Sequence, residues 1–407
     1  MEAFNAAFCR TVDRELAEGV FDEVVAMRRH IHAHPGVGTD TGETEAYVRE
    51  RLTEYGVTVL PARTGVLAVI PGRSHEKMAA LRADMDALPL REENDVPYRS
   101  LYDGKMHACG HDAHTAMLLG AAKILSGHRE ELPCDVLLIF QPSEEGPTVN
   151  GALEMLKETD RLGLTEKICV IFGQHVFNNA PTGRVGTRVG ALAASADTFM
   201  IRFIGRGGHC SEPHLNVDAL SLGVRFVDAM ESFMSRRVDP LDSAVCAIGS
   251  FHAGTSHNIV PETAELSGSI RCQREETREL IKTHLRRIAE GVCHGWDADF
   301  ELKFMPGLPV LVNDGEAAAY ATSVARQTVG RDYYDIPTPR MYAEDFCFYA
   351  QRIPACFLNL GTRNEEKGFV EKNHSPRFDV DEAAFAAGVK MLCSLAANVP
   401  EGMRGRG

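Results

Sequence analysis

The sequence contains no CxxC motif and no stretch of about 18 consecutive apolar residues, the minimum for a helical membrane span. Its 11 cysteines are odd in number and scattered singly, so we expect free thiols in a reducing, cytoplasmic compartment rather than a disulfide framework. The first residues mix acids with bases and lack the apolar core of a secretory signal, which also favours the cytoplasm.

Basic residues are too few for the usual polyanionic partners. The chain has 43 Lys and Arg against 57 Asp and Glu, a net charge of −14, and we expect neither nucleic acid nor a membrane as a partner. Internal repeats and low-complexity segments are also missing, which excludes repeat architectures. With 44% hydrophobic residues, the composition is that of an ordinary globular protein. The length of 407 residues predicts two domains.

Short apolar runs alternate with helical patterns. Five runs have the length of strands and are bounded by turn residues: 65–70, 77–84, 134–140, 167–173 and 354–361. Amphipathic patterns predict helices at 12–34, 42–56 and 114–125. This alternation predicts an α/β fold with a mostly parallel sheet covered by helices on both faces.

Residues 188–304 follow a different order. Their patterns predict strand, helix, strand, strand, helix and strand, which is the ferredoxin-like α+β arrangement. Because the last strand of the first sheet comes later in the sequence, this unit is expected to be an insertion. We therefore predict a discontinuous metal-binding catalytic domain, 1–187 and 305–407, with an inserted domain at 188–304.

Six side chains have the chemistry of a metal centre: Cys109, His111, Glu144, Glu145, His175 and His374. Thiolate, imidazole and carboxylate are the ligands of a zinc-type ion, and five ligands are too many for one tetrahedral site. Two ions sharing a ligand is the simpler interpretation, and such a pair assists hydrolysis. One carboxylate of the adjacent pair would then bind metal while the other remains a base.

These residues follow the predicted strands. Asp86 comes just after the second run, the Glu144-Glu145 pair follows the third, His175 follows the fourth, and His374 lies in the loop after the fifth. Open α/β sheets place their sites at the carboxyl ends of strands. For each residue alone, a structural histidine, a buried free cysteine or a solvated acidic loop would be the ordinary alternative.

Local context suggests a role for each group. Cys109 precedes a helix whose dipole favours the thiolate, and a thiolate can bridge two ions. We assign Glu145 to metal and Glu144 to general base catalysis. Asp86 is a candidate to accept the second N–H of a ligand imidazole. Further candidates for such support are Asp84, His107, Asp112 and His114, none of which we expect to bind metal directly.

The inserted domain carries three polar candidates. His209 lies in a Gly-rich turn at 205–214, which lacks the Lys-Ser/Thr pair of a phosphate-binding loop. We therefore interpret His209 as a polar group that reaches the metal site from the second domain. Asn258 and Arg271 are the others, and Arg suits bidentate binding of a carboxylate. Turn and strand-end chemistry remains the alternative for all three.

At these residues the chain resembles the zinc-dependent aminoacylase/carboxypeptidase metallohydrolases. Within them it is most similar to the amidohydrolase branch of hippurate hydrolases, N-acyl-amino-acid amidohydrolases and auxin-conjugate hydrolases. The matching segments run through nearly the whole chain: 28–36, 81–89, 106–122, 138–146, 173–176, 207–214, 258–261, 342–349 and 373–382.

The resemblance implies two divalent ions per chain, zinc by preference, with manganese, cobalt or nickel as alternatives. It implies an inserted lid or dimerisation domain and a homodimer. His209 would steady the scissile carbonyl, in its own or the partner subunit, while Asn258 and Arg271 would hold the substrate carboxylate. The implied ligands are Cys109, His111, Glu145, His175 and His374, with Glu144 as general base.

The expected function is hydrolysis of the amide bond of N-acyl amino acids by metal-activated water. A carboxypeptidase or dipeptidase using the same dinuclear site is the alternative. A cysteine hydrolase with Cys109 as nucleophile would leave the glutamates and His175 unused, and the retained base argues against an inactive binding scaffold. A zinc deaminase is excluded because its H-x-E and P-C-x-x-C motifs are missing.

Overall fold

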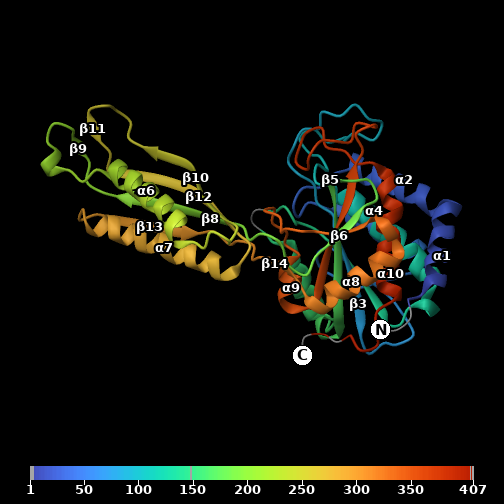
Figure 1. Cartoon of the computed structure of the whole chain (residues 1–407). Coiled ribbons are helices and arrows are strands. Elements are labelled where there is room, and N and C mark those ends of the chain that lie inside the picture. Colours follow the sequence, from blue (N-terminus) through green and yellow to red (C-terminus); the bar gives the residue numbers. More distant parts are fainter. Residues whose placement is uncertain (1–3, 147–148, 404, 406–407) are drawn as a thin grey trace. The chain divides into compact units, whose positions relative to one another are not determined.

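A computed structural model describes residues 4–146, 149–403 and 405, and divides the chain into two compact units (Figure 1). The first unit comprises Met1–Gly190, Val312–Pro337 and Phe348–Gly407. The second comprises Ala191–Leu311 together with Thr338–Cys347. The segment Thr338–Cys347 thus belongs to the second unit, whereas the predicted boundaries place it in the metal-binding domain.

The first unit is built on an eight-stranded sheet in the order β1-β2-β4-β3-β5-β16-β6-β15. Its strands are β1 Thr58–Val59, β2 Val66–Ile70, β3 Met78–Asp84, β4 Asp135–Gln141, β5 Ile168–Pro181, β6 Val185–Thr187, β15 Tyr333–Asp335 and β16 Ala355–Arg363. The four central strands, β4, β3, β5 and β16, run parallel. Every residue of β3 and β4 is buried, so the centre of the sheet is covered on both faces.

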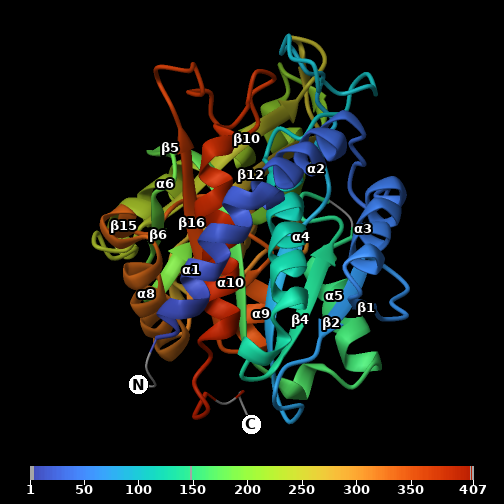
Figure 2. The ribbon, with the colours of Figure 1, turned by 90° about the vertical axis from the view of Figure 1, so that its right-hand side faces the viewer.

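Helices enclose this sheet. Those of the first unit are α1 Ala6–Glu15, α2 Phe21–Ala33, α3 Gly42–Glu54, α4 His111–Gly127, α5 Gly151–Arg161, α8 Gly315–Thr328, α9 Cys347–Arg352 and α10 Phe385–Ala397. Helix α4 is almost entirely buried, with α2 and α10 packed beside it (Figure 2). The mostly parallel α/β fold is thereby confirmed. None of the described helices is long and apolar enough to cross a membrane.

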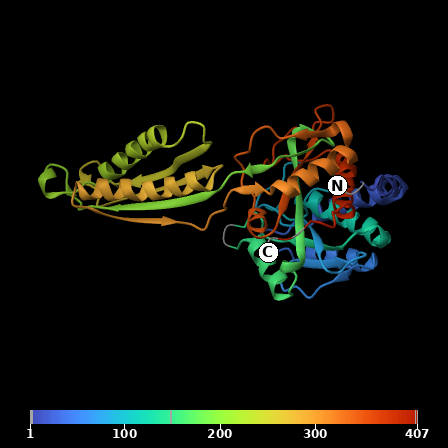
Figure 3. The same ribbon diagram turned by 60° about the horizontal axis from the view of Figure 1, so that its bottom comes forward.

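The second unit has a four-stranded antiparallel sheet in the order β10-β12-β8-β13. Its main elements are β8 Asp197–Ile204, α6 Ala219–Arg237, β10 Ala244–Ala253, β12 Thr263–Cys272, α7 Glu275–His294 and β13 Asp299–Phe304. This is the predicted ferredoxin-like order, and α6 and α7 lie on one face of the sheet (Figure 3). Two small sheets pair β9 Gly208–His209 with β11 Ile259–Val260, and β7 Gly190–Ala193 with β14 Leu311–Asn313.

Candidate metal centre

The turn before α4 brings the first two candidate ligands together. Gly110, between Cys109 and His111, has a φ of 89° and forms the N-cap of α4. A Cβ at Gly110 would stand 2.3 Å from the Val176 side chain. Only glycine combines this left-handed backbone with so close an approach, so the CGH sequence is what brings Cys109 and His111 to the start of the helix.

His175 presents one particular nitrogen to Cys109. Its Nδ1 lies 2.8 Å from the carbonyl oxygen of Val176, an atom that can only accept, so Nδ1 carries the proton. The unprotonated Nε2 lies 3.3 Å from Cys109 Sγ. Burial holds the pKa of His175 well below its usual range. The ring is thus neutral with its lone pair directed at the thiol, as a metal ligand requires.

The expected position of His175 after a strand was wrong. β5 does not end near Gly173 but continues to Pro181, and His175 lies inside it. The reason is the neighbouring strand β16, which pairs in parallel with β5 and places Asn359 opposite His175. The carboxyl half of β5 therefore carries a site residue within the strand itself.

Asp86 organises the two glutamates. Its Oδ1 accepts the backbone N–H of Glu144 at 3.0 Å, and its Oδ2 accepts that of Glu145 at 3.1 Å. The same Oδ1 lies 3.3 Å from Nδ1 of His111. Ser143, immediately before Glu144, adopts a left-handed φ of 57°. A single buried carboxylate therefore fixes both the glutamate turn and one candidate ligand ring, as supporting groups do in metal sites.

The other nitrogen of His111 is available to bind a cation. His111 is fully buried, and within the described residues its Nε2 has no hydrogen-bond partner. Although burial alone would lower the pKa of His111, Asp84, Asp86 and Glu145 raise it to about 10. A positive charge is therefore stabilised at this point, and a divalent ion at Nε2 would supply it.

Glu145 and His374 face each other, 2.9 Å apart between Oε1 and Nε2. His374 has a left-handed φ of 70°, and its backbone N–H bonds to the carbonyl of Ala108 at 2.7 Å. The hydrogen bond with Glu145 raises the pKa of His374. Burial would raise the pKa of Glu145, but the bond with His374 lowers it. The strained backbone directs a half-exposed ring toward the glutamate.

Two potential donor groups share one residue. The ligand atoms of Cys109, His111 and His175 lie within 4.8 Å of one another, and so do those of Cys109 with Glu145 and His374. A third group joins His111 with Glu144 and Glu145. Thiol, imidazole and carboxylate donors arranged in two groups around Cys109 fit two zinc-type ions.

The state of Cys109 bears on the cysteine hydrolase alternative. Burial, reinforced by Glu145 and Glu144, raises the pKa of its thiol well above the usual range. A nucleophilic cysteine needs the opposite environment, in which cations stabilise the thiolate. A divalent ion would reverse this effect, which is consistent with a ligand and not with a nucleophile.

Asp84 and His114 form a further potential donor group with His111, and they also bond to each other. His114 Nδ1 donates to Asp84 Oδ1 at 2.6 Å, and His114 Nε2 accepts the backbone N–H of Val176 at 2.9 Å. Both nitrogens of His114 are occupied. Asp84 also receives Arg82 Nη1 at 2.7 Å. Arg82 was not singled out from the sequence, although a charged residue within an apolar strand is a signal that could have found it.

Asn373 was also missed. Its Nδ2 donates to the carbonyl oxygens of Cys109 at 3.1 Å and Val176 at 3.2 Å. This amide joins the loop of His374 to α4 and β5. Its place immediately before a candidate ligand is the only sequence signal, and a weak one.

Asp112 and His107 are buried among side chains other than the candidate ligands. Asp112 Oδ2 accepts from Arg28 Nε and from His32 Nδ1, both at 2.7 Å. Burial lowers the pKa of His107 to about 3, and neither of its ring nitrogens has a hydrogen-bond partner in the described part of the chain. Asp112 therefore belongs to a buried network with Arg28 and His32, and His107 lies beside that network, with its ring centre 6.2 Å from that of His32.

The three candidates of the inserted region all belong to the second unit. His209 and Asn258 lie together, because β9 pairs His209 with Ile259 and the backbone N–H of Cys210 bonds to the Asn258 carbonyl. His209 Nδ1 is 2.7 Å from Ser211 Oγ. Arg271 lies on β12 opposite Val245, and burial lowers its pKa. The structure thus groups His209 with Asn258 but not with Arg271.

Comparison with known proteins places this geometry in context. Peptidase family M20/M25/M40 matches residues 80–398. An N-acetylcysteine deacetylase of Bacillus subtilis is 36% identical over 93% of this chain and 97% of that protein. Thermostable carboxypeptidase 2 of Saccharolobus solfataricus is 37% identical, with 92% and 95% covered. An IAA-amino acid hydrolase of Arabidopsis thaliana is 36% identical, with 93% and 87% covered.

A solved structure of the same family is also similar to this chain. The crystal structure of a dinuclear metal-binding M20 peptidase from Bacillus subtilis matches with a TM-score of 0.81 and 33% identity. The match covers 93% of this chain and 98% of that one.

Proposed function

The chain belongs to peptidase family M20/M25/M40 and is a metal-dependent amidohydrolase or peptidase, and we propose that its substrates are N-acyl amino acids. Two of its relatives are named for cleaving such compounds, an N-acetylcysteine deacetylase and an IAA-amino acid hydrolase. The observation that carries the proposal is the pair of donor groups sharing Cys109, with Glu144 on the same turn as Glu145.

The proposed ligands are Cys109, His111, Glu145, His175 and His374, and Cys109 belongs to two of the potential donor groups. Zinc suits this donor set best, and manganese, cobalt or nickel are alternatives. Two such ions, when bound, would supply Lewis acidity for the amide carbonyl and would make water more acidic. The protein's share is orientation: Asp86 holds His111, and the Val176 carbonyl fixes the tautomer of His175.

Glu144 is the proposed proton carrier. Its backbone is fixed by Asp86, and a carboxylate oxygen lies within 4.8 Å of a potential ligand atom of His111 and of Glu145. From there the carboxylate takes a proton from the attacking water and delivers it to the amide nitrogen as the C–N bond breaks. The carboxylic acid and the free amino acid are the products.

His209, Asn258 and Arg271 keep their predicted roles as hypotheses, and so does the lid or dimerisation role of residues 188–304. If Arg271 binds the substrate carboxylate, Arg271→Gln should raise KM more than it lowers kcat. If His209 steadies the carbonyl as bond breaking begins, His209→Asn should instead lower kcat.

A carboxypeptidase or dipeptidase is the second candidate, because the Saccharolobus relative is named a carboxypeptidase. The discriminating experiment compares kcat/KM for an N-acetyl or N-benzoyl amino acid with that for a dipeptide ending in the same amino acid. The two substrates differ mainly in the neutral acyl group against a free ammonium. The proposal predicts at least about tenfold preference for the acyl compound, a difference of about 1.4 kcal/mol. Equal or better cleavage of the dipeptide would favour the peptidase, and Glu144→Gln serves as the control for contaminating hydrolases.

A further inference from the structure

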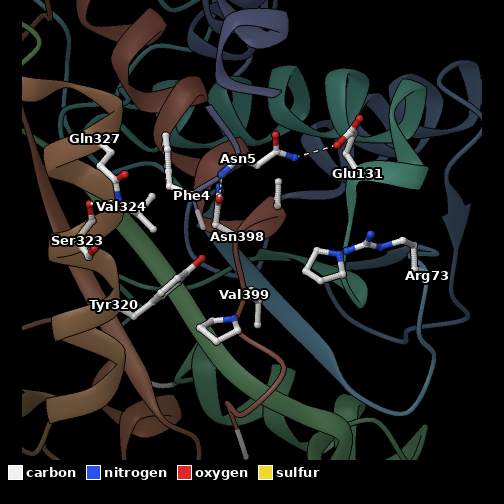
Figure 4. Close-up of a pocket in the computed structure, with 13 residues that line it drawn as sticks. Phe4, Asn5, Arg73, Glu131, Tyr320, Ser323, Val324, Gln327, Asn398 and Val399 are labelled. Atoms are coloured by element: carbon white, nitrogen blue, oxygen red, sulfur yellow. Dashed lines mark hydrogen bonds between the residues drawn. The ribbon is translucent and has the colours of Figure 1, made fainter. Parts of the chain in front are cut away.

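A cavity of about 390 Å³ lies in the first unit, lined by α8, the segment around Asn5 and the residues at the end of α10 (Figure 4). Arg73 and Pro133, two of its lining residues, precede the parallel strands β3 and β4. Asp84 ends β3, and Glu144 follows β4. The cavity is therefore at the amino ends of strands whose carboxyl ends carry the metal centre.

Hydrogen bonds between distant segments hold the upper wall of the cavity. The backbone N–H of Asn5 bonds to Asn398 Oδ1 at 2.6 Å, and the Asn5 side chain donates to Glu131 Oε2 at 2.8 Å. Figure 4 shows Glu131 turned toward Asn5 in this way. The carboxylate of Glu131 is therefore already engaged within the wall.

Hydrogen bonds also hold two other parts of the wall, Tyr320 and the segment at Pro400. Tyr320 donates its hydroxyl to the Leu395 carbonyl at 2.7 Å, which holds its ring in place. Lys77 Nζ donates to the carbonyl of Pro400 at 2.8 Å and to that of Glu401 at 2.7 Å. Because these segments are held before any ligand arrives, binding would cost little ordering entropy.

The lining contains two charged residues, Arg73 and Glu131, both exposed, and Glu131 accepts the hydrogen bond from Asn5. Within the described residues the Arg73 guanidinium makes no ion pair and no side-chain hydrogen bond, and Figure 4 shows it extending toward the cavity. The opposite side combines the apolar or aromatic side chains of Tyr320, Val324 and Val399 with the polar side chains of Ser323 and Gln327. A guanidinium without an ion-pair partner, close to an apolar and aromatic surface, suits an amphipathic anion.

We propose that this cavity binds a small carboxylic acid anion with an apolar body. The carboxylate pairs with Arg73, and the apolar body packs against Tyr320 and Val399. A volume near the lower end of the roughly 300–1,000 Å³ range of ligand pockets fits a compact acid, aromatic or branched aliphatic. The site is separate from the metal centre and does not depend on the proposed substrate.

The test is titration calorimetry of the metal-loaded enzyme with benzoate, with benzamide as its neutral counterpart and with inorganic phosphate. Benzoate should bind, and Arg73→Gln should weaken this binding by about tenfold or more, the loss expected for a charge-assisted hydrogen bond. Arg326→Gln is the matched control, because Arg326 is a nearby exposed arginine paired with Asp335 and does not line the cavity. Benzamide and phosphate should each bind at least tenfold more weakly than benzoate.

Benzoate bound at the metal centre must be distinguished from benzoate in the cavity. Gln327→Trp places a bulky ring in the cavity from α8 and should remove the same binding event as Arg73→Gln. Both variants should retain wild-type kcat and KM. Benzoate binding that is unchanged in both variants would overturn the proposal, as would benzamide or phosphate binding as tightly as benzoate.

Discussion

At the scale of single residues, the centre depends on groups that touch no metal. Asp86 receives two backbone N–H groups and the ring of His111, three bonds that converge on one side chain. Its role as a supporting acceptor could be expected from the sequence, because Asp86 follows a predicted strand. The left-handed backbone at Ser143 and His374 could not, since positive φ is uncommon for any residue other than glycine and no local pattern marks these two positions.

Asp86→Asn should reduce metal affinity and kcat/KM by about 10–100-fold, the usual loss when a supporting carboxylate is removed. The amide can accept through only one atom, so one of the two glutamate N–H groups loses its partner. Asp135→Asn is the control, because Asp135 also accepts a backbone N–H and pairs with a histidine, but at the opposite end of β4. Equal effects of the two variants would show a general loss of stability and contradict the role given to Asp86.

Glu144→Gln should lower kcat by about 10²–10⁴-fold while the metal content stays unchanged, since a general base contributes that much to such reactions. Metal analysis and steady-state kinetics on the same preparation provide the readout. Glu145→Gln is the contrasting variant and should lose metal as well as activity. A nearly normal rate for Glu144→Gln would assign the base elsewhere.

At the scale of elements, the sequence predicted strand positions well where the apolar run ended in a turn, as in β3 and β4. It failed where pairing extended a strand, because β5 continues through His175 alongside β16. The opening helix was also expected as one piece from 12 to 34. It begins at Ala6, and a kink within Leu16–Val20, where Gly19 has a non-helical φ of 128°, separates α1 from α2.

Gly110→Ala tests whether the start of α4 sets the site. The left-handed φ and the nearby Val176 side chain should cost about 1–3 kcal/mol of stability and weaken metal binding. Gly127→Ala, at the other end of α4, has open space for a Cβ and should be neutral or stabilising. Thermal unfolding and metal titration of both variants check this. Unchanged metal affinity in Gly110→Ala would show that the turn does not position Cys109 and His111.

At the scale of the whole molecule, the two units were predictable from the change in element order, but their exact membership was not. The segment Thr338–Cys347 joins the second unit through pairing such as that of Ala193 with Arg340, a long-range contact that no local pattern encodes. The stability of the first unit rests partly on a buried charge network. Arg28 is fully buried and pairs with Asp112 and Asp379, each at 2.7 Å.

Arg28→Met should destabilise the first unit by about 3–5 kcal/mol at pH 7, because two carboxylates lose their buried partner. Burial alone would raise the pKa of Asp112, but Arg28 and His32 hold it well below its usual range. The wild type thus has this stabilisation above about pH 3.9 and loses it as the pH falls further. The free energy of unfolding, measured with urea, should therefore differ less between wild type and variant below that pH.

The control is Arg352→Met, which removes an exposed pair with Asp160 and should cost less than about 1 kcal/mol. If the loss of unfolding free energy in Arg28→Met stays the same as the pH is lowered, the proposed linkage to Asp112 is contradicted.

The central claim is that the donors around Cys109 hold two catalytic ions. Its most direct test is metal content per chain, measured with hydrolysis of an N-acyl amino acid before and after chelation. The account predicts about two ions per chain, with activity lost on chelation and restored by zinc or manganese. Activity that survives complete removal of metal would contradict it.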